Sequence, residues 1–262
     1  MGTLPRRADF AESGLAREDA GVSIASQAVF HGIAAVLALS REVVTRLVPE
    51  PLELAVAAVE DPPASHPVVV LFGEQRHGAV LYGGVPWPLG IRYAELALAV
   101  PYVRVADSPR LHTFVAAMGS GYFPAVWHGN RFFGFRKELI EIARQGVLWW
   151  VSGSDGALRM HAAAQPKGEW ARVRALDEPA LTEILEFFRL PVVGQREDRS
   201  LVTSWWTLSF RNALVRPCEA WVSLDESFVP GLPLGTYPIE QRNAFEIRGM
   251  LWQLSWPRAF RE

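Results

Sequence analysis

The apolar residues of this chain come in short runs that glycine, proline and small polar residues separate. Runs of this kind, rich in valine and aromatic residues, are typical of β-strands. They predict strands over residues 52–59, 68–72, 77–82, 93–100, 122–135, 147–151, 158–163, 200–210, 220–224 and 245–256. The run over residues 29–39 fits either a strand or the start of a helix, since a short apolar run does not separate the two. The Asp155-Gly156 pair predicts a hairpin between two of the strands, because it tolerates a positive φ.

A few segments have apolar residues at helical spacing. Ser40 has the chemistry of an N-cap and Pro49 that of a helix stop, so the first predicted helix lies between them. Three further helices are predicted over residues 111–118, 136–145 and 178–189. Many strands with a few scattered helices predict an α+β chain that is mainly β, with an antiparallel sheet or barrel and peripheral helices.

The length suits one large domain or two small ones. Residues 1–22 are polar and of mixed charge, which predicts an N-terminal arm. Neither a repeat nor a low-complexity tract divides the remainder. We therefore expect a single domain over residues 23–262.

The composition excludes several classes of function. The net charge of −2 offers no large basic field for nucleic acid or an anionic membrane. Cys218 is the single cysteine, so no internal disulfide forms, and no cysteine–histidine spacing predicts a metal site. The start lacks the apolar core of a secretory signal, and the apolar stretch 28–39 is too short to span a bilayer. A reducing, cytoplasmic location fits best.

Lysine is rare in this chain. Of its 26 basic residues only two are lysines, Lys137 and Lys167. Arginine supplies charge equally well, but only an amine can lose its proton and attack a carbonyl carbon. Lys137 is therefore a candidate nucleophile. The alternative is that Lys137 is an ordinary surface charge or ion-pair partner, as its polar surroundings indicate for Lys167.

Several anchor segments of the chain together resemble the acetoacetate decarboxylase superfamily. The matching residues are 47–53, Tyr93-Ala94-Glu95, Pro101, Gly129, the string Gly134-Phe135-Arg136-Lys137-Glu138-Leu139, and residues 245–260. The resemblance covers roughly residues 40 to 260. It implies a closed, largely antiparallel β-barrel with a deep apolar cavity, in a homo-oligomer. It also implies an enzyme that needs no cofactor, in which a buried lysine forms a Schiff base with a keto acid.

The resemblance carries roles to particular residues. Lys137 falls on the position of the reactive lysine, and Glu95 on that of a glutamate that lines the cavity. Glu74 corresponds loosely to a second cavity glutamate. The chain departs from the family pattern at three positions, and these departures count against decarboxylation of acetoacetate itself. Glu138 replaces a second lysine, Arg136 replaces a proline, and Phe30 or His31 falls near the position of an arginine. The amine of the reactive lysine is retained.

The catalytic candidates are Lys137 and Glu95. The lysine must be neutral to attack, and burial, the positive end of the helix predicted to start at residue 136, and the neighbouring Arg136 all favour its neutral form. A carboxylate of Glu138 that faced the lysine would act in the opposite direction. Glu95 suits a general acid or base; the alternative is a structural ion pair with an arginine such as Arg92.

Candidate substrate-binding residues are polar groups near the two catalytic candidates and aromatic residues that either line a pocket or fill a core. They are Glu74, Tyr93, Tyr122, Phe135, Arg136 and Glu138. We expect a Schiff-base lyase that acts on a small or medium keto acid by decarboxylation or by aldol or dehydration chemistry. The alternative is a barrel that binds a hydrophobic ligand without a covalent bond, or a cyclase that works without an imine.

Overall fold

The computed structural model describes most of the chain. The described residues are 23–55, 65–106, 108–173, 181, 184, 188–225, 228–232, 235–239 and 243–260. The arm predicted over residues 1–22 lies outside them, as does most of the helix predicted over residues 178–189. Leu181 and Ile184 of that segment are described, and both are helical and buried.

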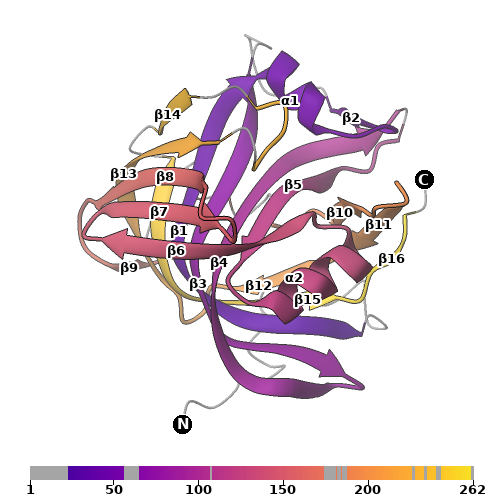
Figure 1. Ribbon diagram of the computed structural model, residues 1–262, viewed down its shortest axis with the longest axis horizontal. Coiled ribbons are helices and arrows are strands. Elements are labelled where there is room, and N and C mark those ends of the chain that lie inside the picture. Colours follow the sequence, from indigo (N-terminus) through magenta and orange to yellow (C-terminus); the bar gives the residue numbers. More distant parts are fainter. Residues whose placement is uncertain are drawn as a thin grey trace.

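Nine strands pair in a ring and form a closed barrel (Figure 1). In chain order they are β1 (Ile24–Ser40), β3 (Ser65–Tyr82), β4 (Val85–Val105), β5 (His112–Ser120), β6 (Lys137–Gln145), β7 (Leu148–Gly153), β8 (Leu158–Pro166), β13 (Leu214–Leu224) and β15 (Ala244–Ser255). The ring closes because β4 pairs with β5 as well as with β3. Its pairings are antiparallel except β5–β6, which is parallel. The mainly β, closed barrel expected from the sequence is confirmed.

Short strands extend or flank the ring. They are β2 (Leu52–Leu54), β9 (Ala171–Arg172), β10 (Val192–Gln195), β11 (Leu201–Ser204), β12 (Trp206–Ser209), β14 (Gly235–Ile239) and β16 (Arg258–Ala259). Strand β10 continues the sheet from β5, and β12 pairs with the far end of β15. The long strands of the ring therefore reach beyond the barrel and carry a second layer of structure on their outer face.

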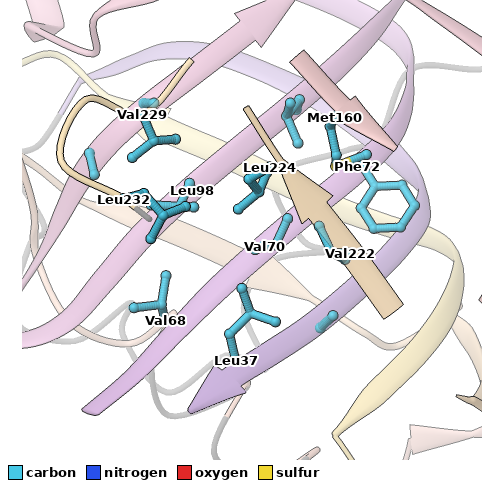
Figure 2. Packing of buried hydrophobic residues seen from close by; sticks show 14 of the residues in the cluster. Leu37, Val68, Val70, Phe72, Leu98, Met160, Val222, Leu224, Val229 and Leu232 are labelled. Carbon is cyan, nitrogen blue, oxygen red and sulfur yellow. The ribbon is translucent and has the colours of Figure 1, made fainter. Parts of the chain in front are cut away.

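Side-chain alternation gives the sheet two separate cores. Leu96 and Leu98 of β4 belong to a cluster to which all nine strands of the ring contribute, so this cluster fills the barrel. Figure 2 shows part of it, where Val70 and Phe72 of β3 pack with residues of β8 and β13. Ala97 belongs instead to a second cluster on the opposite face of β4, which β10, β12 and the helical residues 181 and 184 cover.

Helices are few and short in the described chain. Helix α1 (Arg41–Leu47) begins at Ser40, whose side chain accepts a hydrogen bond from the backbone N–H of Val43, so the predicted N-cap is confirmed. Helix α2 (Phe123–His128) continues into a π-helical turn, η3 (Gly129–Phe133). Among the described residues, no helix is long and apolar enough to cross a membrane.

Three sequence-based expectations about local structure are wrong. Residues 111–118 and 136–145, expected to be helical, form β5 and β6, and residues 122–135, expected to be a strand, form α2 and η3. Every residue of β5 is buried, so its apolar run shows no alternation that would distinguish a strand. Residues 29–39, left open between strand and helix, are part of β1. The hairpin around Asp155-Gly156 is confirmed by β7 and β8.

Candidate functional site

The connection between β5 and β6 places Lys137. These strands are parallel, so the chain must cross from the end of one to the start of the other, and α2 and η3 make that crossing. Gly134 ends η3 in the left-handed conformation, with φ 64°. A Cβ atom there would lie 2.6 Å from the backbone of Gln195, so glycine is required. Lys137 then enters β6 opposite Met118 of β5.

Two residues of the π-helical turn hold Lys137 from the other side. The side chain of Asn130 accepts a hydrogen bond from the backbone N–H of Lys137 at 2.5 Å and donates one to its carbonyl oxygen at 2.8 Å. A Cβ atom on Gly129 would lie 2.7 Å from Cδ of Lys137. The side chain of Lys137 therefore runs directly across Gly129, and the side-chain amide of Asn130 fixes the backbone of the lysine.

A chain of polar groups leads away from the amine of Lys137. Nζ lies 3.1 Å from Oε1 of Glu95, and the two side chains are 9% and 8% exposed. The second oxygen of Glu95 accepts a hydrogen bond from the amide of Gln75 at 2.5 Å. Gln75 in turn accepts one from the indole N–H of Trp252 at 2.8 Å. Each member thus has a fixed orientation, and the carboxylate is held against the amine.

The amine opens into a cavity of about 280 Å³. The cavity lies on the outer face of β3 and β4, opposite the barrel core, because its lining residues Leu71 and Ala97 alternate with core residues. Most of the lining is apolar and includes Phe30, Met118, Phe133, Phe135, Trp206, Leu208, Met250 and Leu254. A buried amine beside a carboxylate in an apolar cavity is an arrangement that can bind and activate a carbonyl compound.

Solved structures share this architecture. Acetoacetate decarboxylase from Legionella pneumophila is 15% identical, with a TM-score of 0.58 over 91% of this chain and 88% of that one. A second acetoacetate decarboxylase structure is 14% identical, with a TM-score of 0.57 over 98% of both chains. The enduracididine biosynthesis enzyme MppR, complexed with pyruvate, is 10% identical, with a TM-score of 0.58 over 90% of both chains.

The chain has the acetoacetate decarboxylase-like fold. No protein-family model matches the sequence, and no curated protein matches it either. At these identities the likeness establishes the fold and leaves the reaction to be argued from this chain's own residues.

Within the acetoacetate decarboxylase-like fold, the structure brings together five of the eight site residues predicted from the sequence. They line the cavity and are Tyr93, Glu95, Tyr122, Phe135 and Lys137. The rings of Tyr93 and Tyr122 stack with centroids 6.1 Å apart. Burial, and then the charge of Glu95, raises the pKa of Tyr93 well above its usual value. Its hydroxyl therefore stays protonated and can donate a hydrogen bond.

Three of the predicted site residues do not line this cavity. Glu74 lies on the opposite face of β3, in a separate polar hollow, where it pairs with Arg76 and Arg92. Arg136 is exposed, and its φ of 41° puts it in the left-handed region that favours glycine. Glu138 accepts a hydrogen bond from Arg159 at 2.8 Å, so its carboxylate is paired away from the amine of the lysine. Since residues 137–145 form a strand, no helix begins at residue 136 to direct its positive end at the amine.

The sequence analysis missed several residues of the site. Gln75 occupies the cavity-facing position on β3, one residue beyond Glu74. Asn130 lies in the turn that leads to Lys137, and Trp252 comes from the distant strand β15. His128 lines the cavity and lies against the rings of Phe132, Phe133 and Trp256. Burial, and then the charge of Lys137, lowers the pKa of His128 to about 4, so its imidazole is neutral at physiological pH. Within the described residues, no cluster of side chains suits a metal ion.

Proposed function

We propose that this protein is an enzyme in which Lys137 forms a Schiff base with the carbonyl carbon of a keto acid. One observation carries the proposal: the Lys137 amine is buried in an apolar cavity and held 3.1 Å from the carboxylate of Glu95. An amine that needed only to be charged would gain nothing from a site that penalises charge, and arginine serves that need elsewhere in this chain.

Proton transfer between the two side chains begins the reaction. Glu95 takes a proton from the Lys137 ammonium, and the neutral amine adds to the substrate carbonyl. The resulting carbinolamine receives the proton back from Glu95 and loses water, which leaves a protonated imine. The contact of 3.1 Å between the amine and the carboxylate is short enough for the first transfer without an intervening water.

The protonated imine then acts as an electron sink. In the decarboxylation of a β-keto acid, the bond between the α carbon and the carboxylate breaks, carbon dioxide leaves, and the bonding electrons move into the imine to form an enamine. Glu95, which has returned its first proton and takes up another from solvent, then protonates the α carbon and restores the imine, which water hydrolyses to release the product and the amine. In an aldol or dehydration reaction the same enamine forms by loss of an α proton to Glu95. The site geometry serves both reactions.

The solved structures with this fold support the proposal in general, but they identify neither the substrate nor the reaction of this chain. The solved chains with this fold are named as acetoacetate decarboxylases and as a biosynthesis enzyme, and the latter was solved with pyruvate bound. A small keto acid is therefore the substrate class to test first.

A second function has its own support. The ion pair with Glu95 already neutralises Lys137, and most of the cavity lining is apolar. Both features suit a protein that binds a hydrophobic ligand without a covalent bond, or a cyclase that works by shape and general acid–base catalysis. In that case Lys137 would have only a structural role.

Borohydride trapping separates the two functions. The protein is incubated with a panel of keto acids, reduced, digested and mapped by mass spectrometry. We expect an adduct on Lys137 that disappears in Lys137→Arg, which keeps the charge and loses the nucleophile. The matched control is Lys167→Arg, at a partly exposed lysine paired with Glu219 at 2.8 Å, which keeps the adduct. Full turnover in Lys137→Arg would contradict the proposal.

Carbon dioxide release from the keto acids that form adducts distinguishes decarboxylation from aldol or dehydration chemistry. The homo-oligomeric state and the cytoplasmic location expected from the sequence stay predictions. Analytical ultracentrifugation of the purified protein measures the first of these directly.

A further inference from the structure

We propose that the Lys137 cavity selects its substrate through a bulky apolar body, a long alkyl chain or an aromatic ring, and not through the substrate's carboxylate. This inference rests on the Schiff-base function proposed above and names the class of keto acid that the site takes. Three features of the cavity carry it: its charges, its buried lining and its mouth.

The charges of the cavity cancel. Among the described residues that line it, Lys137 and Glu95 are the two with charged side chains, and they pair with each other. Of the other ionisable groups in the lining, burial keeps His128 neutral and Tyr93 protonated. After the imine forms, one positive charge faces one negative charge. A substrate carboxylate would then add an unpaired negative charge in a medium that screens it poorly.

The arginines near the site face elsewhere. Arg159 lies against Glu138 and Asp155, and Arg76 and Arg92 lie against Glu74 on the opposite face of β3. A cation that held a substrate carboxylate would have to line the cavity, and none of these three does. Within the described part of the chain, binding energy for the substrate therefore comes from groups other than a fixed positive charge.

The buried lining offers that energy. Beyond the amine, aromatic rings and the flexible side chains of two methionines surround the cavity, and such residues adapt to apolar groups of differing shape. The residues concerned are Phe30, Met118, Phe133, Phe135, Trp206, Leu208, Met250 and Leu254. Acetoacetate and pyruvate are too small to contact more than a fraction of this surface, because pyruvate has one methyl group as its apolar part and acetoacetate one methyl and one methylene group.

Exposed aromatic residues form the mouth of the cavity. Tyr82 and Trp87, at the β3–β4 hairpin, are 53% and 67% exposed, and Trp127 of α2 is 53% exposed. All three line the cavity, so two separate segments of the chain present rings to one opening. Exposed apolar surface that is continuous with a cavity is a common sign of a ligand site. An extended apolar body reaching out from the imine would cover these rings.

Two series of ligands test the proposal. The first is α-keto acids lengthened from pyruvate one methylene at a time, together with phenylpyruvate. The second replaces the carboxylate of each by a methyl group. The concentration that gives half-maximal borohydride adduct on Lys137 is measured for the first series, and tryptophan fluorescence titration is used for both. We expect affinity to rise about fourfold for each methylene until the cavity is filled. Loss of the carboxylate should leave affinity unchanged or raise it, because the cavity holds no free positive charge among its described lining residues.

Matched variants locate the selection at the mouth. Trp87→Ala and Trp127→Ala are expected to lower the preference for the longest over the shortest keto acid at least about fivefold. Val85→Ala and Phe123→Ala are the controls, since these residues are 66% and 64% exposed on the same hairpin and the same helix but do not line the cavity. The controls should keep the preference of the unmodified protein.

The outcomes separate this inference from the Schiff-base function. Adducts on Lys137 with equal half-saturation along the series, or a loss of more than tenfold on removal of the carboxylate, would overturn the apolar selection and leave the Schiff base standing. Selective binding of long ligands without any adduct would support the apolar selection and overturn the Schiff base. Absence of both binding and adducts across the two series would overturn the inference itself.

Discussion

The side chain of Lys137 rests on Gly129. A Cβ atom on that glycine would lie 2.7 Å from Cδ and 3.0 Å from Cε of the lysine, so any larger residue must push the amine aside. We expect Gly129→Ala to slow adduct formation about a hundredfold, because displacement of a reacting group by about 1 Å has costs of this size. The rate of borohydride trapping measures it.

Gly235→Ala is the matched control for that substitution. A Cβ atom on Gly235 meets nothing within 4 Å, and the residue lies in β14, away from the cavity. Thermal melting of both variants shows whether the fold is kept. Unchanged trapping in a folded Gly129→Ala variant would mean that the lysine position is not set by this contact.

Glu95→Gln tests the proton transfers. The amide keeps the size of the carboxylate and a hydrogen bond to the lysine, but it neither accepts a proton nor returns one. We expect turnover to fall about 10²–10⁴-fold, the usual contribution of a general acid or base. Product formation by the variant and by the unmodified protein is compared under saturating substrate. Turnover within a factor of two of the unmodified protein would assign Glu95 a structural role.

The two catalytic candidates could be found from the sequence because they depend on residue type. A lysine is conspicuous in a chain with only two, and the motif around Glu95 and Lys137 carries the resemblance. The closed barrel follows from many short apolar runs and is likewise predictable. What the runs did not show is where each strand begins, since β3 and β4 continue through residues that interrupt the apolar pattern.

Gln75 on β3 shows why the other site residues could not be predicted from the sequence. Successive side chains of a strand face opposite sides, so a shift of one residue moves a group from one hollow to another. Glu74 has the more suggestive chemistry, yet Gln75 is the residue that reaches Glu95. Its partner Trp252 is 177 positions away in the chain, and only the closed ring of strands brings the two together.

The segment that leads to Lys137, residues 122–135, could not be predicted from its local pattern either. Its aromatic residues suggested a strand, but Pro124 in the first turn of α2 and the parallel pairing of β5 with β6 make it a helical crossing. A parallel pair requires a crossing, and this requirement is visible only when both strands are known. Asn130 and His128 enter the site through that crossing, so no local pattern identified them.

Cys218 is expected to be inert in the folded protein. It is fully buried, and burial together with the charge of Glu246 raises the pKa of its thiol to about 12. At mildly alkaline pH the thiolate fraction is about a thousandfold below that of a free cysteine. Thiol reagents should therefore modify the chain only after denaturation. Rapid labelling of the folded protein would show that the strand β13 opens around this residue.

His128 makes the stability of the fold depend on pH. Because the pKa of His128 is about 4 when folded and near 6.5 when unfolded, the unfolded chain binds the extra proton between these values. The free energy of unfolding should fall by on the order of 3 kcal/mol as the pH drops through this window. His128→Phe, which suits its aromatic neighbours and removes a buried Nε2 that lacks a partner among the described residues, should reduce the slope. His112, whose pKa burial also lowers to about 4, keeps its share. Urea unfolding at several pH values measures the pH dependence of the free energy of unfolding for the unmodified protein and for His128→Phe. Equal slopes for the two proteins would contradict a buried, neutral His128.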